Sequence, residues 1–557
     1  MSKPKKILGI DLGTTYSCVA YINEYGQPEV IPNANGEPTT PSVVWFDGKR
    51  AVVGQEAKEM SSIHPHAVCG FVKRSMGNEH FTFDVGGVAY TPEHVSSLVL
   101  KKIVQDACET LGEKINDVVI TCPAYFFVKE REATKRAGEI AGLNVLQIVN
   151  EPTAAAFAYG IKPNEETKER FALVYDLGGG TFDTTVIRIS KKGIDVLCTD
   201  GDHQLGGKDW DDCLVRHILR RFTDETGQHT AAGDDPEFYY DVLQKAEQCK
   251  KQLTDRTRTK TTLSYQGHKV TVEITRDEFE QMTEALLDRT VTLTRSLLAT
   301  AKAKGCTTFD QLILVGGSAR MPQITQRLRR EFSIEPVLFE PDEAVAKGAA
   351  IIGNNIYLQS LVRKKLKTQL TTATQDELRD AAKAVADEYQ LPIGTVTGSM
   401  KRTKNVTSKT FGIMVLDGYD EENRPLLSVS NLIYRNTPLP AECTEQYATI
   451  AAKQQVVVVE LVENSYDAPE PGSPFEPSVD VNQTTSLWEG ELPVQPDLPI
   501  YSPIDVTFRV DVNGRLFIVA YDPASGGKIQ KAIPELDAQQ AANMLEVTKR
   551  TVALVVE

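Results

Sequence analysis

Apolar and polar positions follow two periods along the first two thirds of the chain. Strict alternation predicts strands at Tyr16–Ile22 and Thr181–Ile189. Apolar residues spaced three and four apart predict helices at 92–111, 129–141, 210–226, 276–303 and 322–332. Short apolar runs predict further strands at 117–122, around Val145 and at 311–315. This order of strands and helices is typical of an α/β domain.

One strand–turn–strand pattern occurs twice. Lys6–Tyr16 reads KILGIDLGTTY, and Leu173–Asp183 reads LVYDLGGGTFD. In each copy an apolar strand ends in Asp-Leu-Gly, a turn of small residues follows, and an alternating strand begins, which predicts a β-hairpin. Two related α/β halves of this kind face each other across a cleft, and ligands bind beyond the carboxyl ends of the strands.

The pattern changes after about residue 355. Residues 362–409 carry ten basic and five acidic residues in an otherwise acidic chain. Within them Thr374–Glu377 forms a capping box, which predicts the start of a helix that stops before Pro392. This basic, partly helical segment either docks an acidic partner or presents a solvated linker surface.

The last part of the chain is β-like. Alternating segments predict strands at 411–416, 426–434, 447–450, 456–462, 504–512 and 515–521. Eight prolines between residues 463 and 503 predict a loop, and residues 536–557 predict one helix and a short strand. We therefore expect an α/β domain at 1–357, a basic insert at 358–409, a β-sandwich at 410–534 and a short helical tail at 535–557.

Composition narrows the class of protein. The chain has 557 residues and a net charge of −15, which argues against binding to nucleic acid or to an anionic membrane. No apolar run approaches the roughly 18 residues of a membrane span, and Asp11 interrupts the run that a signal peptide would need. Nine scattered cysteines without a C-x-x-C pair indicate reduced thiols in a cytoplasmic protein. His64, His66 and Cys69 lie close together but favour a polar loop over a metal site, because no fourth ligand accompanies them.

The two glycine-rich turns indicate a phosphate site. Their backbone N–H groups would point into one cleft, where fixed dipoles hold a polyphosphate. Thr14, Thr15 and Thr181 add hydroxyl groups, and the nearby carboxylates of Asp11, Asp176 and Asp183 suit a nucleotide–Mg²⁺ complex. The patterns G-x-x-x-x-G-K-[ST] and strand–G-x-G-x-x-G–helix are absent, which removes the P-loop and Rossmann interpretations. A third turn, Val315–Pro322, could place a ribose or phosphate at a helix N-terminus, with Arg320 beside a base.

These motifs together resemble one family. The resemblance rests on Gly9–Ser17, Asn150–Ala156, Asp176–Asp183, Leu205–Trp210 and Val315–Pro322. In this order and spacing they are similar to the heat shock protein 70 (DnaK-like) chaperones over residues 5–357. The resemblance implies an actin-like ATPase domain made of two duplicated halves around a nucleotide cleft. It also implies ATP or ADP, Mg²⁺ and K⁺ as cofactors.

The resemblance also implies roles for individual residues. Lys73 corresponds to the catalytic lysine that stabilises charge at the γ-phosphate, and Glu151 to the acid that completes the magnesium shell. Asp11, Asp176 and Thr181 complete the catalytic set, and Asp11, Asp176 and Asp183 hold the metal through water. The nucleotide-binding set is Gly13, Thr14, Thr15, Tyr16, Gly178, Gly179, Gly180, Asp183, Gly206, Gly207, Glu247, Lys250, Lys251, Thr254, Gly316, Gly317, Ser318, Arg320 and Asp342. Taken without the family, Lys73 would be a surface lysine and Glu151 an acid at a helix N-terminus.

The chain departs from the family in the parts that couple its domains. Pro123 and Arg131 resemble the relay that reports nucleotide state, but Phe127 and Val128 replace polar residues there. The family's short acidic-leucine linker is replaced by the basic insert. Too few residues follow Gly527 for the family's α-helical lid, so we expect fast peptide exchange.

The β-region resembles the family's peptide-binding domain through Leu432–Pro440 and Ile504–Leu516. By position, Ile413, Tyr447, Val457 and Val459 would line a groove for an extended hydrophobic peptide. The alternative is that these four side chains are simply sandwich core.

We therefore expect a monomeric cytoplasmic ATPase that couples nucleotide state to the binding of extended hydrophobic polypeptides in protein folding. The resemblance implies a J-domain co-chaperone and a nucleotide exchange factor as partners, and no nucleic acid or membrane. A nucleotide switch or scaffold for one dedicated partner is the main alternative. A small-molecule kinase and a filament-forming relative on the same fold are the others.

Overall fold

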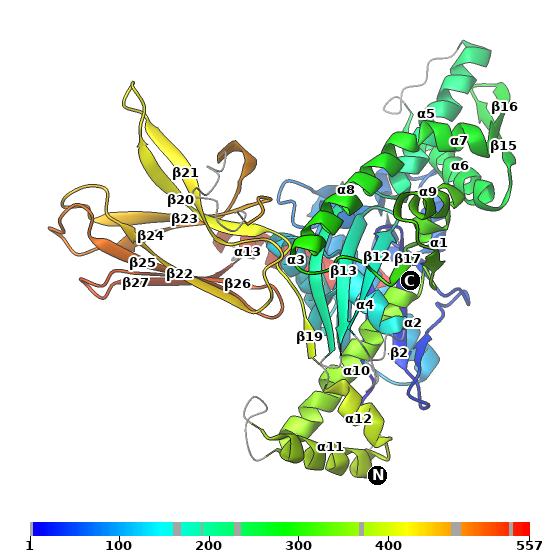
Figure 1. Cartoon of the computed structure of the whole chain (residues 1–557). Helices are drawn as coiled ribbons and strands as arrows, with labels where there is room; N and C mark the ends of the chain where they lie inside the picture. The colour runs from blue at the N-terminus through cyan, green and yellow to red at the C-terminus, as the bar shows by residue number, and fades with distance from the viewer. Residues whose placement is uncertain are drawn as a thin grey trace.

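The computed structural model describes residues 4–159, 169–190, 193–227, 235–366, 373–400, 402–468, 481–533 and 538–557. The chain forms an α/β body of two lobes, a small helical unit below it, and a β-sandwich that projects from one side (Figure 1). We call the lobe that contains β1 lobe I and the lobe that contains β12 lobe II.

Lobe I is built on a sheet with strand order β11-β10-β1-β2-β3, and β4 also pairs with β2. These strands are β1 Leu8–Asp11, β2 Tyr16–Ile22, β3 Pro28–Val30, β4 Thr40–Pro41, β10 Asp117–Cys122 and β11 Asn144–Asn150. A smaller sheet has the order β28-β6-β5-β7, with β5 Val43–Asp47, β6 Arg50–Val53, β7 Val68–Gly70 and β28 Val555–Val556. The remaining elements are the hairpin β8 Phe83–Val85 and β9 Val88–Tyr90, with helices α1 Gln55–Met60, α2 Pro92–Leu111, α3 Val128–Ile140 and α4 Glu151–Ala158.

Lobe II repeats the arrangement in a sheet with the order β18-β17-β12-β13-β14-β19. Its strands are β12 Arg170–Leu177, β13 Phe182–Ser190, β14 Gly193–Asp202, β17 Gln311–Val315, β18 Pro336–Leu338 and β19 Arg402–Lys404. A separate hairpin joins β15 Arg258–Tyr265 to β16 His268–Thr275. The helices are α5 Gly207–Thr226, α6 Pro236–Asp255, α7 Arg276–Met282, α8 Glu284–Ala303 and α9 Pro322–Phe332. α10 Ala344–Lys365 follows β18 and packs on β1, β2 and α4 of lobe I.

The predicted duplication is confirmed by the strand pairing. In both lobes the first strand pairs antiparallel with the second strand of its hairpin, β1 with β2 and β12 with β13. In both lobes the same first strand pairs parallel with a later strand, β1 with β10 and β12 with β17. The two glycine-rich turns therefore occupy equivalent places at the carboxyl ends of β1 and β12.

The single long helix predicted at 276–303 is wrong. The structure divides it into α7 and α8 at Thr283, whose backbone leaves the helical region at φ −110° and ψ 4°. The buried Thr283 hydroxyl donates to the carbonyl of Phe279 and also bonds Gln323 of α9. Side-chain bonds of this kind compete with the helix ladder, and hydrophobic periodicity does not reveal them.

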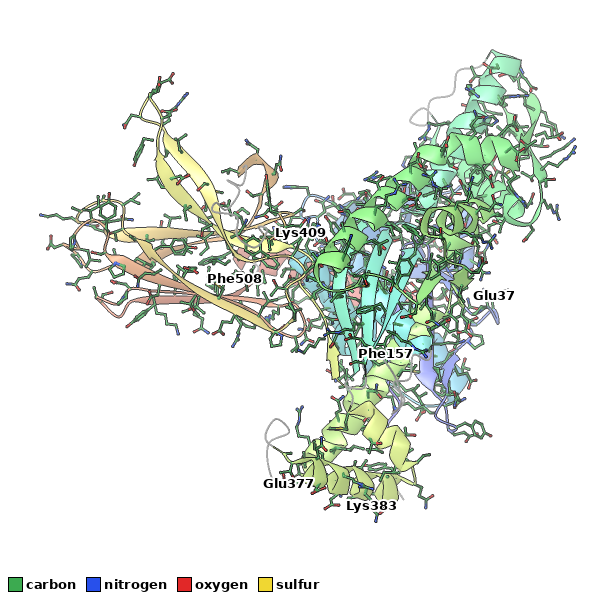
Figure 2. The ribbon with its side chains drawn as sticks, viewed as in Figure 1. Glu37, Phe157, Glu377, Lys383, Lys409 and Phe508 are labelled. Atoms are coloured by element: carbon green, nitrogen blue, oxygen red, sulfur yellow. The ribbon has the colours of Figure 1, made fainter. Side chains whose placement is uncertain are left out.

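Before β19, which joins the lobe II sheet, the described part of the basic insert folds as a helical unit. α10 runs through the boundary predicted at residue 357, and α11 Gln375–Tyr389 and α12 Ile393–Ser399 pack against it. The predicted capping box is present, because Thr374 and Glu377 bond each other's backbone N–H groups. Leu358, Val362 and Val385 are among the residues of a separate small core. Figure 2 shows Glu377 and Lys383 on this unit, at the bottom of the view and below the α/β body.

The sandwich has two four-stranded sheets, with the orders β21-β20-β23-β24 and β22-β25-β26-β27. Its strands are β20 Thr410–Tyr419, β21 Pro425–Ile433, β22 Ala441–Ala448, β23 Val456–Asn464, β24 Thr485–Pro493, β25 Pro503–Val510, β26 Leu516–Tyr521 and β27 Lys528–Ile533. The loop predicted over 463–503 is wrong where β24 lies. Leu487 and Leu492 of that strand are buried in the sandwich core, which Phe508 also occupies (Figure 2).

The final described segment, α13 Ala538–Ala553 followed by β28, confirms the predicted helix and short strand. It does not extend from the sandwich as a separate tail. β28 pairs parallel with β6, and α13 contacts α2 and β9, so both elements belong to lobe I. Figure 1 marks this end of the chain within the α/β body.

Candidate nucleotide site

A cleft of about 740 Å³ lies between the two lobes and collects most of the predicted residues. Those that line it are Asp11, Gly13, Thr14, Thr15, Tyr16, Lys73, Glu151, Asp176, Gly178, Gly179, Thr181, Glu247, Lys250, Lys251, Thr254, Gly316, Gly317, Ser318, Arg320 and Asp342. They come from both hairpin turns, from a short 3-10 helix, from α4 and α6, from the turn after β17 and from the loop between β18 and α10. Residues far apart in the sequence therefore converge on one cavity large enough for a nucleotide.

The two hairpin turns approach each other more closely than side chains would allow. A Cβ atom at Gly179 would lie 2.0 Å from Thr15 Oγ1, and a Cβ at Gly180 would lie 2.4 Å from Thr14 Cγ2. Glycine is therefore needed at both positions, because only its missing side chain permits this contact. The backbone N–H groups of both turns consequently lie beside one cavity, in the arrangement that binds phosphate oxygens.

Four predicted residues do not line the cleft. Gly180, Gly206 and Gly207 lie behind it, where Gly207 N–H donates to the carbonyl of Gly178 at 3.0 Å and Gly206 packs on Gly180. Asp183 is buried, and one of its carboxylate oxygens accepts the Tyr125 N–H at 2.9 Å. These residues therefore support the glycine turns without lining the cleft.

Lys73 and Glu151 form a buried ion pair on the lobe I side of the cleft. Lys73 Nζ lies 2.6 Å from Glu151 Oε1, and the two side chains are only 6% and 8% exposed. Lys73 is placed by a short 3-10 helix at Val72–Ser75, and Glu151 is the first residue of α4. The surface position that Lys73 would have as an isolated residue is therefore excluded.

Three further carboxylates are buried around this pair. Burial, together with the charge of Glu151, raises the pKa of Asp11 to about 7 and that of Asp183 to about 8. The same two causes raise the pKa of Asp176 well above its usual range. Burial acts to lower the pKa of Lys73, but the charges of Glu151 and Asp11 outweigh it, and this pKa is raised. The protein alone thus leaves an excess of negative charge that a cation would stabilise.

The donor set fits magnesium bound through water. Within the described ranges, no three side chains of His, Cys, Asp or Glu converge to hold a metal directly. Mg²⁺ keeps several waters and takes one or two carboxylates together with phosphate oxygens. The buried carboxylates next to the two glycine turns match that requirement.

The opposite end of the cleft carries a network that joins the lobes. Tyr16 Oη donates to Glu247 Oε1 at 3.1 Å and accepts from Lys58 and Lys251, each at 2.9 Å. Lys58 also pairs with Glu247 across the cleft. Burial acts to raise the pKa of Glu247, but the charges of Lys58 and Lys251 outweigh it and lower this pKa to about 2. Lys58, on α1, was not predicted from the sequence, because nothing near it indicates a site.

An apolar wall completes the same end and was also missed. Its members that line the cleft are Met321, Leu338, Pro341 and Val345. Leu338 is 43% exposed, so part of this wall is accessible from the cleft. Such a surface beside Arg320 and Lys251 suits the flat face of a base. These residues come from separate elements, so no local pattern indicates them.

The predicted relay lies where the sandwich meets lobe I. Arg131 Nε donates to the carbonyl of Phe126 at 3.2 Å, and Val128 packs into the sandwich core. Lys409, at the start of the sandwich, donates to Tyr125 Oη at 2.9 Å and lies over the rings of Tyr125 and Phe127. Figure 2 shows Lys409 at this junction. The apolar replacements at Phe127 and Val128 therefore form direct contacts between the domains.

The four candidate groove residues lie with the sandwich core. Ile413 and Val459 are buried at 4% and 2% exposure, and Tyr447 and Val457 pack partly buried against the same cluster. Tyr447 Oη also bonds Ser430 Oγ at 2.9 Å. In this arrangement the four side chains stabilise the sandwich, which matches the alternative interpretation made from the sequence.

The remaining candidates are placed without a ligand role. His64 stacks on Trp45 with ring centroids 5.5 Å apart, and Cys69 is buried in the core of lobe I. None of the helices in the described ranges is long and apolar enough to cross a membrane.

Comparisons with known proteins agree with this geometry. Residues 7–364 match the family model described as "Hsp70 protein". The chain is also 34% identical over 532 residues to "Chaperone protein DnaK" from Halobacterium salinarum, in strain R1 and again in strain NRC-1. Each alignment covers 94% of this chain and 74% of the relative.

Proposed function

The chain belongs to the Hsp70 family, and on that premise we propose how its cleft and its sandwich carry out the family's work. It is an ATPase and an ATP-dependent chaperone that acts in protein folding, and it uses ATP or ADP with Mg²⁺. The observation that carries the proposal is the cleft itself, where two glycine turns face the buried Lys73–Glu151 pair.

We assign hydrolysis to the residues around that pair. Lys73 would stabilise the charge that develops on the transferred phosphoryl group, and Glu151 holds the Lys73 ammonium in place. Asp11, kept in position by a bond from Thr121 at 3.2 Å, and Asp176 would orient the attacking water. Mg²⁺, when bound, neutralises the phosphate oxygens. The backbone N–H groups of the two turns and Thr181 would hold the phosphates.

We assign the nucleoside to the other end of the cleft. Glu247, Lys250 and Lys251 on α6 and the turn from Gly316 to Arg320 would surround the ribose and base. Lys250 is held by Asp211 at 2.7 Å and by the carbonyl of Gly207 at 3.0 Å, so its ammonium has a defined position. K⁺ is proposed as a further cofactor.

The other proposals concern organisation and partners. We keep the four-part division of the chain, with the tail at 535–557 assigned to the ATPase body. The partners proposed are extended hydrophobic polypeptides, a J-domain co-chaperone and a nucleotide exchange factor, and the working state is a monomer in the cytoplasm. All nine cysteines are free thiols, which supports a reducing compartment.

Single-turnover ATP hydrolysis tests the assignment. The variant is Lys73→Ala, and Lys135→Ala on exposed α3 surface is the matched control. We expect Lys73→Ala to slow hydrolysis by at least about 100-fold, the range for removal of one charge-stabilising group, while ATP still binds. Wild-type rates in the variant would refute the role of Lys73.

The same assay with an extended hydrophobic peptide separates the two candidate functions. Acceleration by peptide supports a coupled chaperone. The second candidate, a nucleotide switch for one dedicated partner, is favoured by the burial of Ile413 and Val459. If the rate of hydrolysis is the same with and without peptide, the ATPase assignment stays intact and the nucleotide switch is supported.

A further inference from the structure

The segment α13–β28 is bonded to lobe I along its backbone. β28 pairs parallel with β6, with Val555 opposite Arg50 and Val556 opposite Ala51. Glu557 N–H donates to the carbonyl of Ala51 at 3.1 Å, and the Glu557 carbonyl accepts from Val53 N–H at 2.9 Å. The segment therefore adds a strand to an edge of the small sheet of lobe I.

Side chains anchor the same segment. Val556 is 6% exposed and belongs to the main core of lobe I, and Thr551 is 2% exposed. His94, fully buried on α2, contacts Thr548 Oγ1 through Nε2 at 3.1 Å. Lys101 Nζ donates to the carbonyl of Leu554 at 3.3 Å. The attachment is thus part of the interior of lobe I.

Because of this attachment, the sandwich is held to the α/β body at both of its ends, and we call these two attachments anchors. On one side β19, which pairs with β14 in lobe II, is separated from β20 by residues 405–409. On the other side β27 is separated from α13 by residues 534–537. With four residues between them, the Cα atoms of Ile533 and Ala538 can lie at most about 17 Å apart even when the chain is fully extended. The sandwich therefore cannot move far from the body while both anchors hold.

The interface between the sandwich and lobe I contains an electrostatic conflict. Glu130 on α3 and Glu463 on β23 repel each other across it. Among the described residues, each of them buries one carboxylate oxygen without a hydrogen-bond partner. The nearby cations are engaged elsewhere, since Lys409 bonds Tyr125 and Ser465, and Lys129 pairs with Glu79 at 3.0 Å. Burying carboxylates without partners makes docking less favourable. The attachment of β28 to β6 offsets part of this cost, because it keeps the sandwich close to the body.

We propose that residues 538–557 act as an intramolecular clasp that holds the sandwich docked on the ATPase body. Release of β28 from β6 is the step that frees the sandwich to move. The clasp acts through chain connectivity and needs no peptide in the sandwich. It therefore goes beyond the function proposed above.

Val556→Asp tests the clasp, and Val555→Asp is its matched control, because Val555 is 58% exposed one residue earlier. Hydrogen exchange is measured at β6 and at residues 405–409, and the radius of gyration is measured by X-ray scattering. For Val556→Asp we expect exchange at least about 10-fold faster at both places and a larger radius, with Val555→Asp unchanged. Faster exchange at β6 with wild-type exchange at residues 405–409 would overturn the proposal.

An engineered disulfide between β6 and β28 provides a second test if Val556→Asp fails to fold. Arg50→Cys with Val555→Cys places two thiols on directly paired residues of β6 and β28. Exchange at residues 405–409 is compared with and without ATP, in the oxidised and in the reduced protein. We expect ATP to speed exchange only in the reduced protein. An equal response in both forms, including no response in either, would overturn the proposal.

Discussion

At the scale of single residues, burial decides what a charged side chain does in this molecule. Lys73 and Glu151 are charged and nearly inaccessible, and three further carboxylates lie around them. Removing one member of a buried pair leaves the other charge without compensation. The same principle applies at the domain interface, where Glu130 and Glu463 each bury a carboxylate oxygen that has no hydrogen-bond partner among the described residues.

Lys73→Ala should therefore destabilise the nucleotide-free protein. We expect a loss of about 3 kcal/mol in the free energy of unfolding of the ATPase body, the range for breaking a buried pair. The control Lys135→Ala, at a 37% exposed side chain, should change it by less than about 0.5 kcal/mol. Urea denaturation measures both, and equal values for the two variants would contradict the buried pair.

The docked interface should weaken as the pH rises. Burial, with the charge of Glu130, raises the pKa of Glu463 from 4.5 to about 8, and burial raises that of Glu130 from 4.5 to about 7. When docking raises the pKa of a carboxyl group, docking is most favourable below the undocked pKa, where the group is protonated in both states. This contribution is lost as the pH rises from the undocked pKa to the docked pKa. Between pH 6 and pH 9 we expect docking to lose about 4 kcal/mol, about two thirds of it from Glu463.

Glu463→Gln tests this dependence because glutamine keeps the size of the side chain and removes its titration. Scattering across the same pH range should show expansion in the wild type and a much smaller change in the variant. Asp497→Asn, at a 79% exposed side chain, is the matched control and should behave like the wild type. A pH response that persists unchanged in Glu463→Gln would exclude this residue as its source.

At the scale of elements, the two glycine turns depend on each other. Gly178 and Gly179 are adjacent, yet only Gly179 has a side chain from the other turn against it. A Cβ at Gly178 would meet its nearest atom at 3.5 Å, which is ordinary contact, whereas one at Gly179 would meet Thr15 Oγ1 at 2.0 Å. The closeness of the two lobes, and not local backbone geometry, imposes glycine here.

Gly179→Ala should consequently push the turns apart. We expect a loss of about 1–3 kcal/mol in stability, as for other overpacked sites, together with weaker ATP binding. Gly178→Ala should keep wild-type stability. Thermal denaturation and nucleotide titration distinguish the two variants, and equal stability would show that the turns can separate freely.

At the scale of the whole molecule, the two lobes are joined across the cleft by side chains at the end that we propose for the nucleoside. Lys58 of lobe I pairs with Glu247 of lobe II, and both bond Tyr16. These side chains are 19% and 14% exposed, so water screens the pair only in part. An opening of the cleft has to break this network.

Lys58→Ala should speed nucleotide release. A partly buried charge-assisted bond is worth about 1.5 kcal/mol, which corresponds to about a 10-fold faster release of ADP. Lys49→Ala, at an exposed position outside the cleft, is the matched control. Stopped-flow displacement of a fluorescent ADP measures both, and an unchanged rate in Lys58→Ala would show that the network does not limit opening.

The sequence by itself determined the duplicated hairpins, the helices α2, α3, α5 and α9 of the body, and most of the polar residues that line the cleft. These features follow from local periodicity and from short motifs such as Asp-Leu-Gly, whose chemistry is carried by neighbouring residues. It also predicted the capping box at Thr374 and the final helix and strand. The resemblance to a family added Lys73 and Glu151, whose burial no local pattern indicates.

Only the tertiary structure decided what depends on contacts between distant segments. Lys58 reaches Glu247 and Tyr16, and Leu338 lines the cleft, because the lobes close on each other, and β24 exists because β23 offers it a partner along its whole length. The packing of Ile413 and Val459 into the core depends on how the two sheets of the sandwich face each other. The attachment of β28 to β6 depends on an edge formed some 500 residues earlier in the chain. A sequence records which segments can form strands, whereas burial and pairing across the whole chain select their partners.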